Sequence, residues 1–268
     1  MLIDGNNFPG TIQFLDLEFS RFSFEETVDD VKRRSAQVHF SYIVTPNVDH
    51  VVKLNDRADT IVTRQFKAAY EAADLRLCDS RILSRLAMIF GLRLSVVAGS
   101  DLTAALFDRI FSSGVKVAII GGNSNTVPRL TALFPGPEFV QHIPPMSVLS
   151  NPAALQIAER FVGESRANFS LFAIGAPQSE ILAHRCALQG MARGVGLCIG
   201  ASIDFLLGDQ GRAPRWMQRA GLEWAYRLAS DPKRLWRRYL IEGPRVFLIA
   251  MKWWRSHQQG PARLKDSF

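Results

Sequence analysis

Short apolar runs alternate with longer amphipathic stretches along residues 1–208, and this alternation limits the fold more than any other feature of the sequence. The stretches between the runs have helical spacing, as in PAALQIAERFVGES at residues 152–165. Strands that alternate with helices form βαβ units, which place the strands parallel to one another in one sheet. The apolar runs have the length of strands and fall at residues 40–44, 75–78, 94–97, 115–120, 169–174 and 195–199.

The predicted fold is therefore α/β, with a Rossmann-like, mostly parallel sheet flanked by helices. Small and polar residues follow the predicted strands. These segments are TPN from residue 45, DSR from 79, GSD from 99, GGNSN from 121, GAPQSE from 175 and GASID from 200. Since ligands of such sheets bind outside the carboxyl ends of the strands, we expect the functional site at this edge.

Gly121 and Gly122 lie between a predicted strand and a predicted helix. Glycines let the backbone approach a ligand closely, and the start of a helix favours anions, which suits a phosphate group. An ordinary tight turn explains the pair equally well, because neither of the common glycine-rich nucleotide motifs is present. Both interpretations stay open from the sequence.

Asp79 directly follows an apolar run. A partly desolvated carboxylate at the ligand edge can act as a general base. Alternatively, Asp79 or Ser80 caps the helix that follows, and position alone favours the cap. Asp101 and Asp204 have the same two interpretations, and capping is favoured for Asp101 because it opens a helix.

Thr45 and Asn47 place a hydroxyl and an amide at the end of another strand, where they could bind a sugar or the edge of a uracil base. The alternative interpretation is that the two residues form a turn and cap the helix that follows. The five histidines form no spaced pair with another ligand residue, and no Asp-x-Asp pair is present to hold a metal–diphosphate. We therefore predict no metal. Without a metal, the negative charge of a leaving diphosphate would have to be stabilised by cationic side chains or by the N-termini of helices.

The composition changes near residue 209. Residues 209–268 hold thirteen of the 32 Lys and Arg residues, five of the 25 Asp and Glu residues, and all five tryptophans. We predict an α/β catalytic domain at residues 1–208 and a basic, Trp-rich helical appendage at residues 209–268. If the appendage folds over the strand ends, its arginines suit phosphate binding. These arginines are Arg212, Arg215, Arg219 and Arg227.

Basic amphipathic helices with tryptophans lie on anionic membranes, and this is the interpretation that the appendage favours. A solvated basic face over an aromatic core stripe is one alternative. Nucleic acid is another, but no nucleic-acid motif appears, so we predict none as a partner. The sequence predicts no signal peptide and no apolar run long enough to span a bilayer. The three cysteines lie far apart, which is typical of reduced thiols in the cytosol.

The order of TPN, Asp79, GSDL, GAPQSE, G-x-S-x-DFL-x-G and RAPRWMQRAGLEWAYRL resembles the WecG/TagA/CpsF glycosyltransferase family, from about residue 10 to about residue 240. The resemblance implies an inverting enzyme that moves a sugar from a UDP-sugar to a polyprenyl-diphosphate-linked sugar. It implies a role in surface polysaccharide or teichoic acid assembly. It also implies a peripheral position on the cytoplasmic face of the plasma membrane.

The resemblance implies that Asp79 is the general base, that Thr45 and Asn47 belong to the site, and that appendage arginines complete it. We expect the other substrate-binding residues at Gly99, Ser100, Asp101, Gly121, Gly122, Gly175, Pro177, Gln178, Glu180, Gly200 and Asp204. The chain departs from the family pattern at Ser80, Val96 and Ser179, where the family often has Gly, Arg and Gln. These changes indicate a subfamily with different sugars.

Two other functions are compatible with the sequence. The first is a nucleotide-dependent oxidoreductase or epimerase on the same type of sheet, against which the missing glycine-rich motif and the basic appendage argue. The second is a membrane adaptor without enzymatic activity. We expect no cofactor beyond the donor substrate, and the sequence is compatible with a homo-oligomer.

Overall fold

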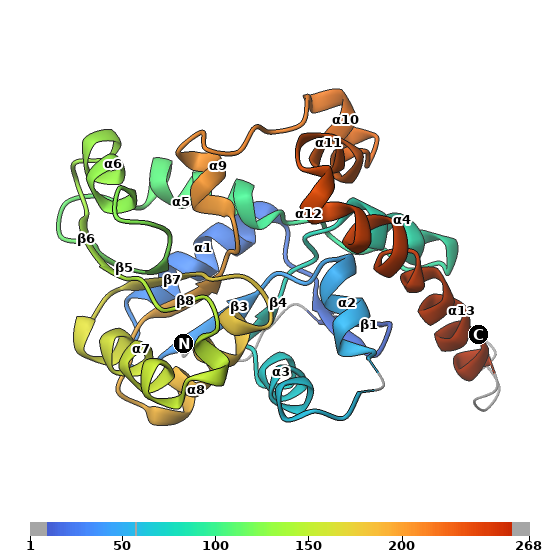
Figure 1. Ribbon diagram of the computed structural model, residues 1–268, viewed down its shortest axis with the longest axis horizontal. Helices are drawn as coiled ribbons and strands as arrows, with labels where there is room; N and C mark the ends of the chain where they lie inside the picture. The colour runs from blue at the N-terminus through green and yellow to red at the C-terminus, as the bar shows by residue number, and fades with distance from the viewer. Residues whose placement is uncertain (1–9, 57, 259–268) are drawn as a thin grey trace, which may run out of the picture.

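The computed structural model describes residues 10–56 and 58–258, without the side chain of Arg215. Its centre is a six-stranded sheet of order β4-β3-β8-β7-β5-β6, in which every neighbouring pair is parallel (Figure 1). The predicted α/β fold with a parallel sheet is confirmed. The strands are β3 (Ser41–Val44), β4 (Leu75–Arg76), β5 (Lys116–Gly121), β6 (Glu138–His142), β7 (Phe169–Ala173) and β8 (Val195–Cys198).

Two details differ from the sequence prediction. The strand expected at residues 94–97 is reduced to one parallel bridge between Cys78 and Val96, because the chain turns into α5 immediately afterwards. Strand β6 was not predicted. It lies at the edge of the sheet, pairs only with β5 and has no fully buried residue, so its sequence lacks the apolar run of a central strand.

Helices cover both faces of the sheet, and the strand residues alternate between two cores. In β3, Tyr42 and Val44 face one core and Ile43 faces the other. The first helix opens with a capping box, in which Ser23 and Glu26 each bond to the other's backbone. One core contains residues of α2 (Val48–Leu54), α3 (Ile61–Glu71), α4 (Arg81–Ile89), α7 (Pro152–Ser165) and α8 (Gln178–Gln189). The other contains residues of α1 (Phe24–Ser35), α5 (Gly99–Arg109), α6 (Thr126–Leu133) and α9 (Ser202–Leu206). A short 3₁₀ turn, η1 (Val148–Ser150), precedes α7.

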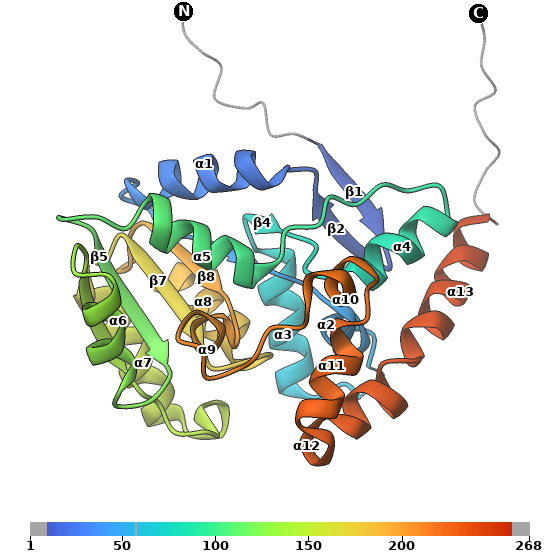
Figure 2. The ribbon, with the colours of Figure 1, turned by 90° about the horizontal axis from the view of Figure 1, so that it is seen from above.

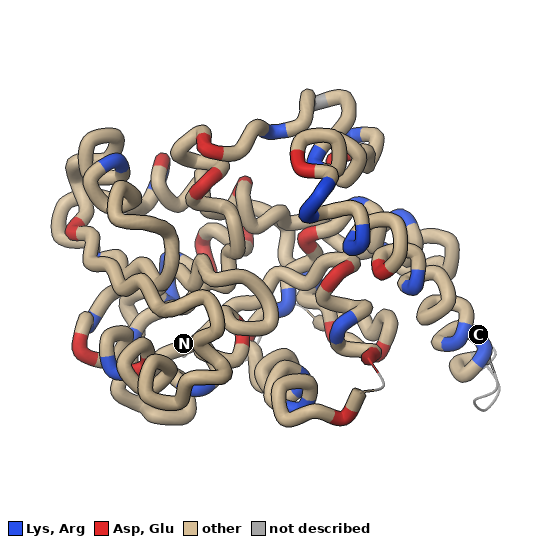
Figure 3. Tube along the Cα trace, in the orientation of Figure 1, with Lys and Arg blue, Asp and Glu red and all other residues tan. Residues whose placement is uncertain are grey.

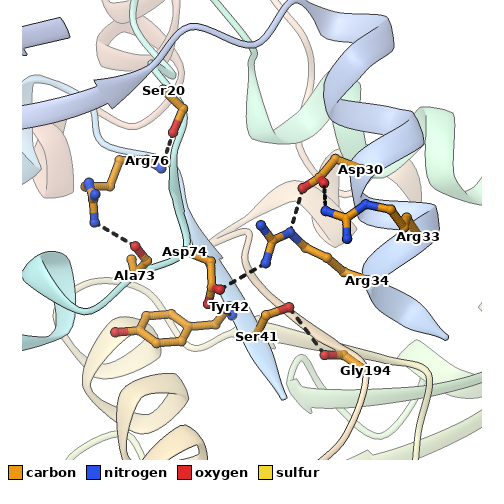
Figure 4. A network of polar contacts seen from close by, with 10 residues as sticks. All are labelled: Ser20, Asp30, Arg33, Arg34, Ser41, Tyr42, Ala73, Asp74, Arg76 and Gly194. Carbon is orange, nitrogen blue, oxygen red and sulfur yellow. Dashed lines mark hydrogen bonds and ion pairs between the residues drawn. The ribbon is translucent and has the colours of Figure 1, made fainter. Parts of the chain in front are cut away.

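A buried network joins α1 to the amino ends of the strands, opposite the predicted ligand edge (Figure 4). Arg34 bonds to Asp30 on its own helix and, at 2.9 Å, to Asp74 just before β4. Asp74 also accepts from the backbone N–H of Tyr42 in β3, at 3.0 Å. Because the charges are paired and hydrogen-bonded, this network serves to fix the helix on the sheet.

The C-terminal segment is helical, as predicted. Its elements are α10 (Arg215–Arg219), α11 (Glu223–Ser230), α12 (Pro232–Trp236), the π-helix η2 (Arg237–Glu242) and α13 (Arg245–Gln258). Lys and Arg recur along these helices (Figure 3). The Arg85 guanidinium donates to the carbonyls of Arg219 at 2.7 Å and Ala220 at 2.6 Å, which attaches α10 to α4. Whether residue 209 is a domain boundary stays a prediction.

Helix α13 packs beside α4 and an antiparallel hairpin of β1 (Thr11–Phe14) and β2 (Leu17–Ser20) (Figure 2). The ring of Trp253 lies edge-on to Phe14, with 5.3 Å between the ring centroids, and to Phe90, with 6.0 Å. This aromatic cluster binds the C-terminal end of the appendage to the body of the protein.

Replacing Trp253 by Ala is expected to destabilise the protein by about 3–5 kcal/mol, since a buried aromatic side chain would be replaced by a cavity. Trp253 is 8% exposed, whereas its neighbour Trp254 is 37% exposed. Trp254→Ala is therefore the control and should cost much less. Urea unfolding of both variants measures the difference, and equal free energies of unfolding would contradict the packing of α13 described above.

Candidate active site

A cleft of about 400 Å³ opens at the carboxyl edge of the sheet, where the sequence places the ligand site. One side consists of the segments that follow β3, β4, β7 and β8. The other side comes from α11, α12 and η2 of the C-terminal segment. The sequence-predicted residues that line this cleft are Thr45, Asn47, Asp79, Ser100, Gly175, Glu180, Gly200 and Arg227.

Thr45 and Asn47 are held by the backbone around them. The Thr45 hydroxyl donates to the carbonyl of Cys198 at 3.1 Å, which ties the ends of β3 and β8 together. The Asn47 side-chain oxygen accepts from the backbone N–H of Asp49 at 3.0 Å and caps α2. The cap predicted as an alternative is therefore present, and it also fixes Asn47 at the wall of the cleft.

Asp79 does not cap α4, the helix that follows it. The hydroxyl of Ser80 caps α4 instead, by accepting from the N–H of Leu83 at 3.2 Å. Asp79 Oδ1 accepts from the N–H of Gly99 at 3.1 Å, at the start of α5. Burial raises the pKa of Asp79 to about 7, and the Gly99 hydrogen bond and the charge of Arg227 offset only part of this effect. A carboxylate with a pKa near neutrality is suited to take a proton.

Glu180 is a second buried carboxyl group in the same cleft. It is 2% exposed, and burial raises its pKa to about 7, although a bond to its own backbone N–H and the charge of Lys53 oppose the shift. Lys53 Nζ donates to the carbonyl of Ala176 at 3.2 Å and pairs with Asp49 Oδ2 at 2.9 Å. The Glu180 end of the cleft thus contains both signs of charge.

Three arginines of the C-terminal segment line the opposite wall, and each is paired with a carboxylate. Arg227 bonds to Glu223 at 2.6 Å, and its guanidinium lies over the ring of Phe205, 4.8 Å from the centroid. Arg238 pairs with Asp49 on α2 at 3.3 Å. Arg234 pairs with Asp231 at 2.6 Å. The cleft therefore places guanidinium groups opposite the two buried carboxyl groups.

The Gly121–Gly122 turn has a structural explanation. Gly121 has a φ of +114°, and a Cβ at this position would lie 2.7 Å from the carbonyl oxygen of Ala173. The Gln141 amide donates to the carbonyls of Gly121 at 2.8 Å and Asn123 at 3.0 Å. Close packing against β7 thus requires glycine at 121, and neither glycine of the pair is among the described residues that line the cleft.

The remaining predicted residues lie around the cleft. Asp101 and Arg212 line a small adjoining pocket and pair with each other at 2.8 Å. Asp204 accepts from the Gln210 amide at 3.2 Å. The side chain of Arg215 lies outside the described residues. Gly99, Pro177, Gln178, Asp204 and Arg219 are not part of the described cleft lining.

Several residues of the cleft were not predicted from the sequence as site residues, among them His50, Lys53, Glu223, Trp224, Arg234 and Arg238. Spacing would have indicated some of them. His50 and Lys53 follow Asn47 at intervals of three residues, which places them on one side of α2. Arg234 and Arg238 lie four residues apart on α12 and the η2 helix that continues it, the repeat of one helix face, whereas Arg227 lies on the separate helix α11.

The cleft thus combines a carboxylate with a pKa near 7, polar strand ends and a row of arginines, an arrangement suited to proton removal next to a phosphorylated ligand. A sequence model described as the Glycosyl transferase WecG/TagA/CpsF family matches residues 12–260. The chain belongs to this family. The resemblance on which the sequence expectations rest is confirmed.

This WecG/TagA/CpsF protein is therefore a glycosyltransferase. The match includes the sheet and all of the C-terminal helices from α10 to α13, so both walls of the cleft are part of the family sequence. It favours the glycosyltransferase over the oxidoreductase or epimerase alternative. No helix among residues 10–56 and 58–258 is both long and apolar enough to cross a bilayer.

Proposed function

We propose that this glycosyltransferase moves a sugar from a UDP-sugar to a polyprenyl-diphosphate-linked sugar, in the assembly of a bacterial surface polysaccharide or teichoic acid. The observation that carries the proposal is Asp79, a carboxyl group with a pKa of about 7 at the strand edge of a cleft whose other wall is lined with arginines. The family membership supports the reaction type.

In the proposed step, Asp79 takes the proton from a hydroxyl of the acceptor sugar as that oxygen attacks the anomeric carbon of the donor. The new carbon–oxygen bond forms while the bond from the anomeric carbon to the UDP oxygen breaks. The electron pair of the broken bond leaves with UDP, and the proton stays on Asp79. A single displacement of this kind inverts the anomeric centre.

The leaving diphosphate needs positive charge. We propose that Arg227, Arg234 and Arg238 supply it without a metal ion, because all three line the cleft and a planar guanidinium suits phosphate oxygens. Each of these arginines pairs with a carboxylate, and a diphosphate would replace those partners. The sequence also predicted that Arg212 and Arg219 bind the diphosphate, but neither residue lines the described cleft.

The pH dependence of the reaction follows from the pKa of Asp79. A general base works only when ionised, so kcat/KM is expected to rise with pH and to level off above the pKa of about 7. Below that pH it should fall about tenfold per pH unit, as for one ionising group. Initial rates of UDP release at subsaturating donor, between pH 5 and 9, measure this. A profile that is flat between pH 5 and 8 would contradict the assigned base.

Donor binding distinguishes this function from its alternatives. Calorimetric titration with UDP and with NAD(H) is expected to give a binding signal for UDP only. Binding of NAD(H) without UDP would favour the oxidoreductase. Binding of UDP-sugars without any transfer to a range of lipid-linked acceptors would favour the adaptor.

We further propose that the enzyme works on the cytoplasmic face of an anionic membrane, bound there by its C-terminal helices. Apolar side chains of α13, including Phe247, Leu248 and Met251, are at least half exposed, and Lys252 and Arg255 lie on the same helix. Exposed apolar groups next to basic ones suit the interface of a bilayer with anionic lipids. A lipid-linked acceptor would be reached from this position.

Leu248→Glu is expected to weaken binding to vesicles that contain anionic lipid by roughly tenfold or more, because it replaces an apolar contact with a like charge. Leu248 is 68% exposed, and Leu133 on α6, at 58%, provides a matched control in Leu133→Glu. Co-sedimentation with vesicles measures both variants. Equal binding by the two variants would show that α13 is not the contact surface.

A further inference from the structure

The wall of the cleft contains a histidine that the proposed reaction does not use. His50 lies on α2, lines the cleft and is 8% exposed. Its Nδ1 lies 2.7 Å from the hydroxyl of Tyr70, and the rings of both residues lie edge-on to the ring of Phe66. Tyr70 and Phe66 belong to α3, so this helix holds the imidazole of His50 in one orientation.

The hydroxyl of Tyr70 determines which ring nitrogen of His50 carries the proton. Tyr70 is 1% exposed, and Nδ1 of His50 is the only hydrogen-bond partner of its hydroxyl in the described structure. Burial raises the pKa of Tyr70 well above its ordinary value, and the charge of Glu180 adds to this effect, so the hydroxyl keeps its proton. Because a buried hydroxyl proton needs an acceptor, Tyr70 donates to Nδ1, and the proton of a neutral imidazole is then on Nε2.

Nε2 of His50 is thus a hydrogen-bond donor without an acceptor in the described part of the chain. It bonds to none of the described residues, and it is not among their buried side-chain atoms that lack a partner, so it remains open to the cleft. Oε2 of Glu180 is one of those buried atoms, so Nε2 does not donate to it. The N–H of His50 is therefore available to a ligand.

The charges around His50 indicate what kind of acceptor suits this N–H. Burial lowers the pKa of His50 to about 3; Asp49 opposes this shift, whereas Lys53 and Arg238 add to it. The imidazole is therefore neutral near pH 7. Lys53 and Arg238, whose Nε has no partner in the described structure, already offer charged donors to phosphate oxygens. A neutral N–H instead suits an uncharged oxygen, such as a sugar hydroxyl or an amide carbonyl.

We propose that His50 is a substrate-binding residue whose Nε2–H donates a hydrogen bond to a hydroxyl or carbonyl oxygen of a sugar in the cleft. Tyr70 is the positioning residue that keeps the proton on Nε2. The inference rests on the proposed glycosyl transfer and adds a contact to its site. Asp79 takes up a proton in the reaction, whereas His50 keeps its proton throughout.

Two substitutions distinguish the two nitrogens of His50. The amide of Asn reaches about as far as Nδ1, so His50→Asn can keep the bond to Tyr70 but cannot reach the substrate. The amide of Gln reaches about as far as Nε2 and can donate into the cleft. We expect His50→Gln to keep kcat/KM within about threefold of the wild type and His50→Asn to lose about tenfold, the cost of one hydrogen bond.

The rate measured is UDP release, with the fastest donor of a panel of UDP-sugars and a polyprenyl-diphosphate-linked sugar as acceptor. Calorimetric titration with UDP is the second measurement. Because the proposed bond goes to a sugar, the affinity for UDP should stay within about twofold of the wild type in both His50 variants. Thermal unfolding shows whether each variant is folded.

Tyr70→Phe tests the positioning role through its dependence on His50. Phe fills the same space but gives Nδ1 no proton, so the proton is no longer fixed on Nε2. We expect Tyr70→Phe to lower kcat/KM by about three- to tenfold when His50 is present and by less than about twofold in the His50→Gln background. An equal loss in both backgrounds would contradict the positioning role.

His184 is the matched control, because its Nδ1 also lies close to a tyrosine hydroxyl, at 3.1 Å from that of Tyr42. It is not part of the described cleft lining, and the Tyr42 hydroxyl donates to the carbonyl of Ala69. His184→Asn and His184→Gln should therefore both keep the wild-type kcat/KM. A loss in these variants like that of His50→Asn would show that the assay responds to packing, and would overturn the inference.

The inference and the proposed function can fail separately. Equal kcat/KM values for His50→Asn and His50→Gln, or a tenfold loss of UDP affinity in His50→Asn, would overturn the inference and leave the proposed function standing. If the wild type neither binds nor releases UDP, the proposed function is wrong. Should a His50 variant not fold, Tyr70→Phe decides: a wild-type kcat/KM overturns the inference, and a lower kcat/KM with unchanged UDP affinity supports it.

Discussion

Replacing Asp79 by Asn is expected to lower kcat by roughly 10²–10⁴-fold, the range that general acid–base catalysis contributes. Asn has the size of Asp and can still accept the 3.1 Å hydrogen bond from the N–H of Gly99, but it cannot take a proton. Donor binding should therefore persist, with a KM within a few-fold of the wild type. Steady-state UDP release with saturating donor and acceptor measures kcat.

Two controls separate this loss of activity from a loss of structure. Asp59→Asn makes the same chemical change at an exposed position and should leave kcat unchanged. The folded-state pKa of Asp79 lies above its ordinary value, so its ionisation costs stability, progressively from about pH 4 and fully above about pH 7. Asp79→Asn should therefore be at least as stable as the wild type at pH 8. A kcat within about threefold of the wild type would rule out Asp79 as the base.

Arg227→Ala is expected to lower kcat by roughly 10²–10³-fold, the cost of removing one group that stabilises developing negative charge in an active site. Arg227 lines the cleft, and its charge lowers the pKa of Asp79 against the larger effect of burial. Its removal should therefore also move the midpoint of the kcat/KM–pH profile upward. A role of Arg227 in folding alone would not move this midpoint.

Arg64→Ala is the control for the arginine, because Arg64 is exposed and pairs only with Asp59 in the described structure. It should retain the wild-type kcat and pH profile. The contradicting result is that Arg227→Ala raises KM and leaves kcat and the pH midpoint unchanged. Arg227 would then bind the substrate and the transition state equally well, and the proposed stabilisation of the leaving group would be wrong.

Much of the sheet could be predicted because its central strands are buried on both faces and read as continuous apolar runs. The runs at residues 115–120 and 169–174 correspond closely to β5 and β7. A strand without this pattern could not be predicted, as for β6 at the edge of the sheet. The prediction also failed at residues 94–97, where an apolar run makes only one bridge before α5 begins.

The body side of the candidate site was predictable for a related reason. Thr45, Asn47 and Asp79 follow strands, and parallel strands bring their carboxyl ends to one edge. The arginines were harder to predict, because their positions depend on how the C-terminal helices fold back on the sheet. Arg212 belongs to the same basic segment as Arg227 but pairs with Asp101 in the adjoining pocket, a contact that no local pattern indicates.

The most direct test of the central claim is acceptor-dependent release of UDP, with a panel of UDP-sugars and a short-chain polyprenyl-diphosphate-linked sugar in vesicles. The proposed function predicts release by the wild type only when donor and acceptor are both present, a product with inverted anomeric configuration, and release by Asp79→Asn that is slower by roughly 10²–10⁴-fold. Release that does not require the acceptor, or release by Asp79→Asn at a rate within about threefold of the wild type, would contradict it.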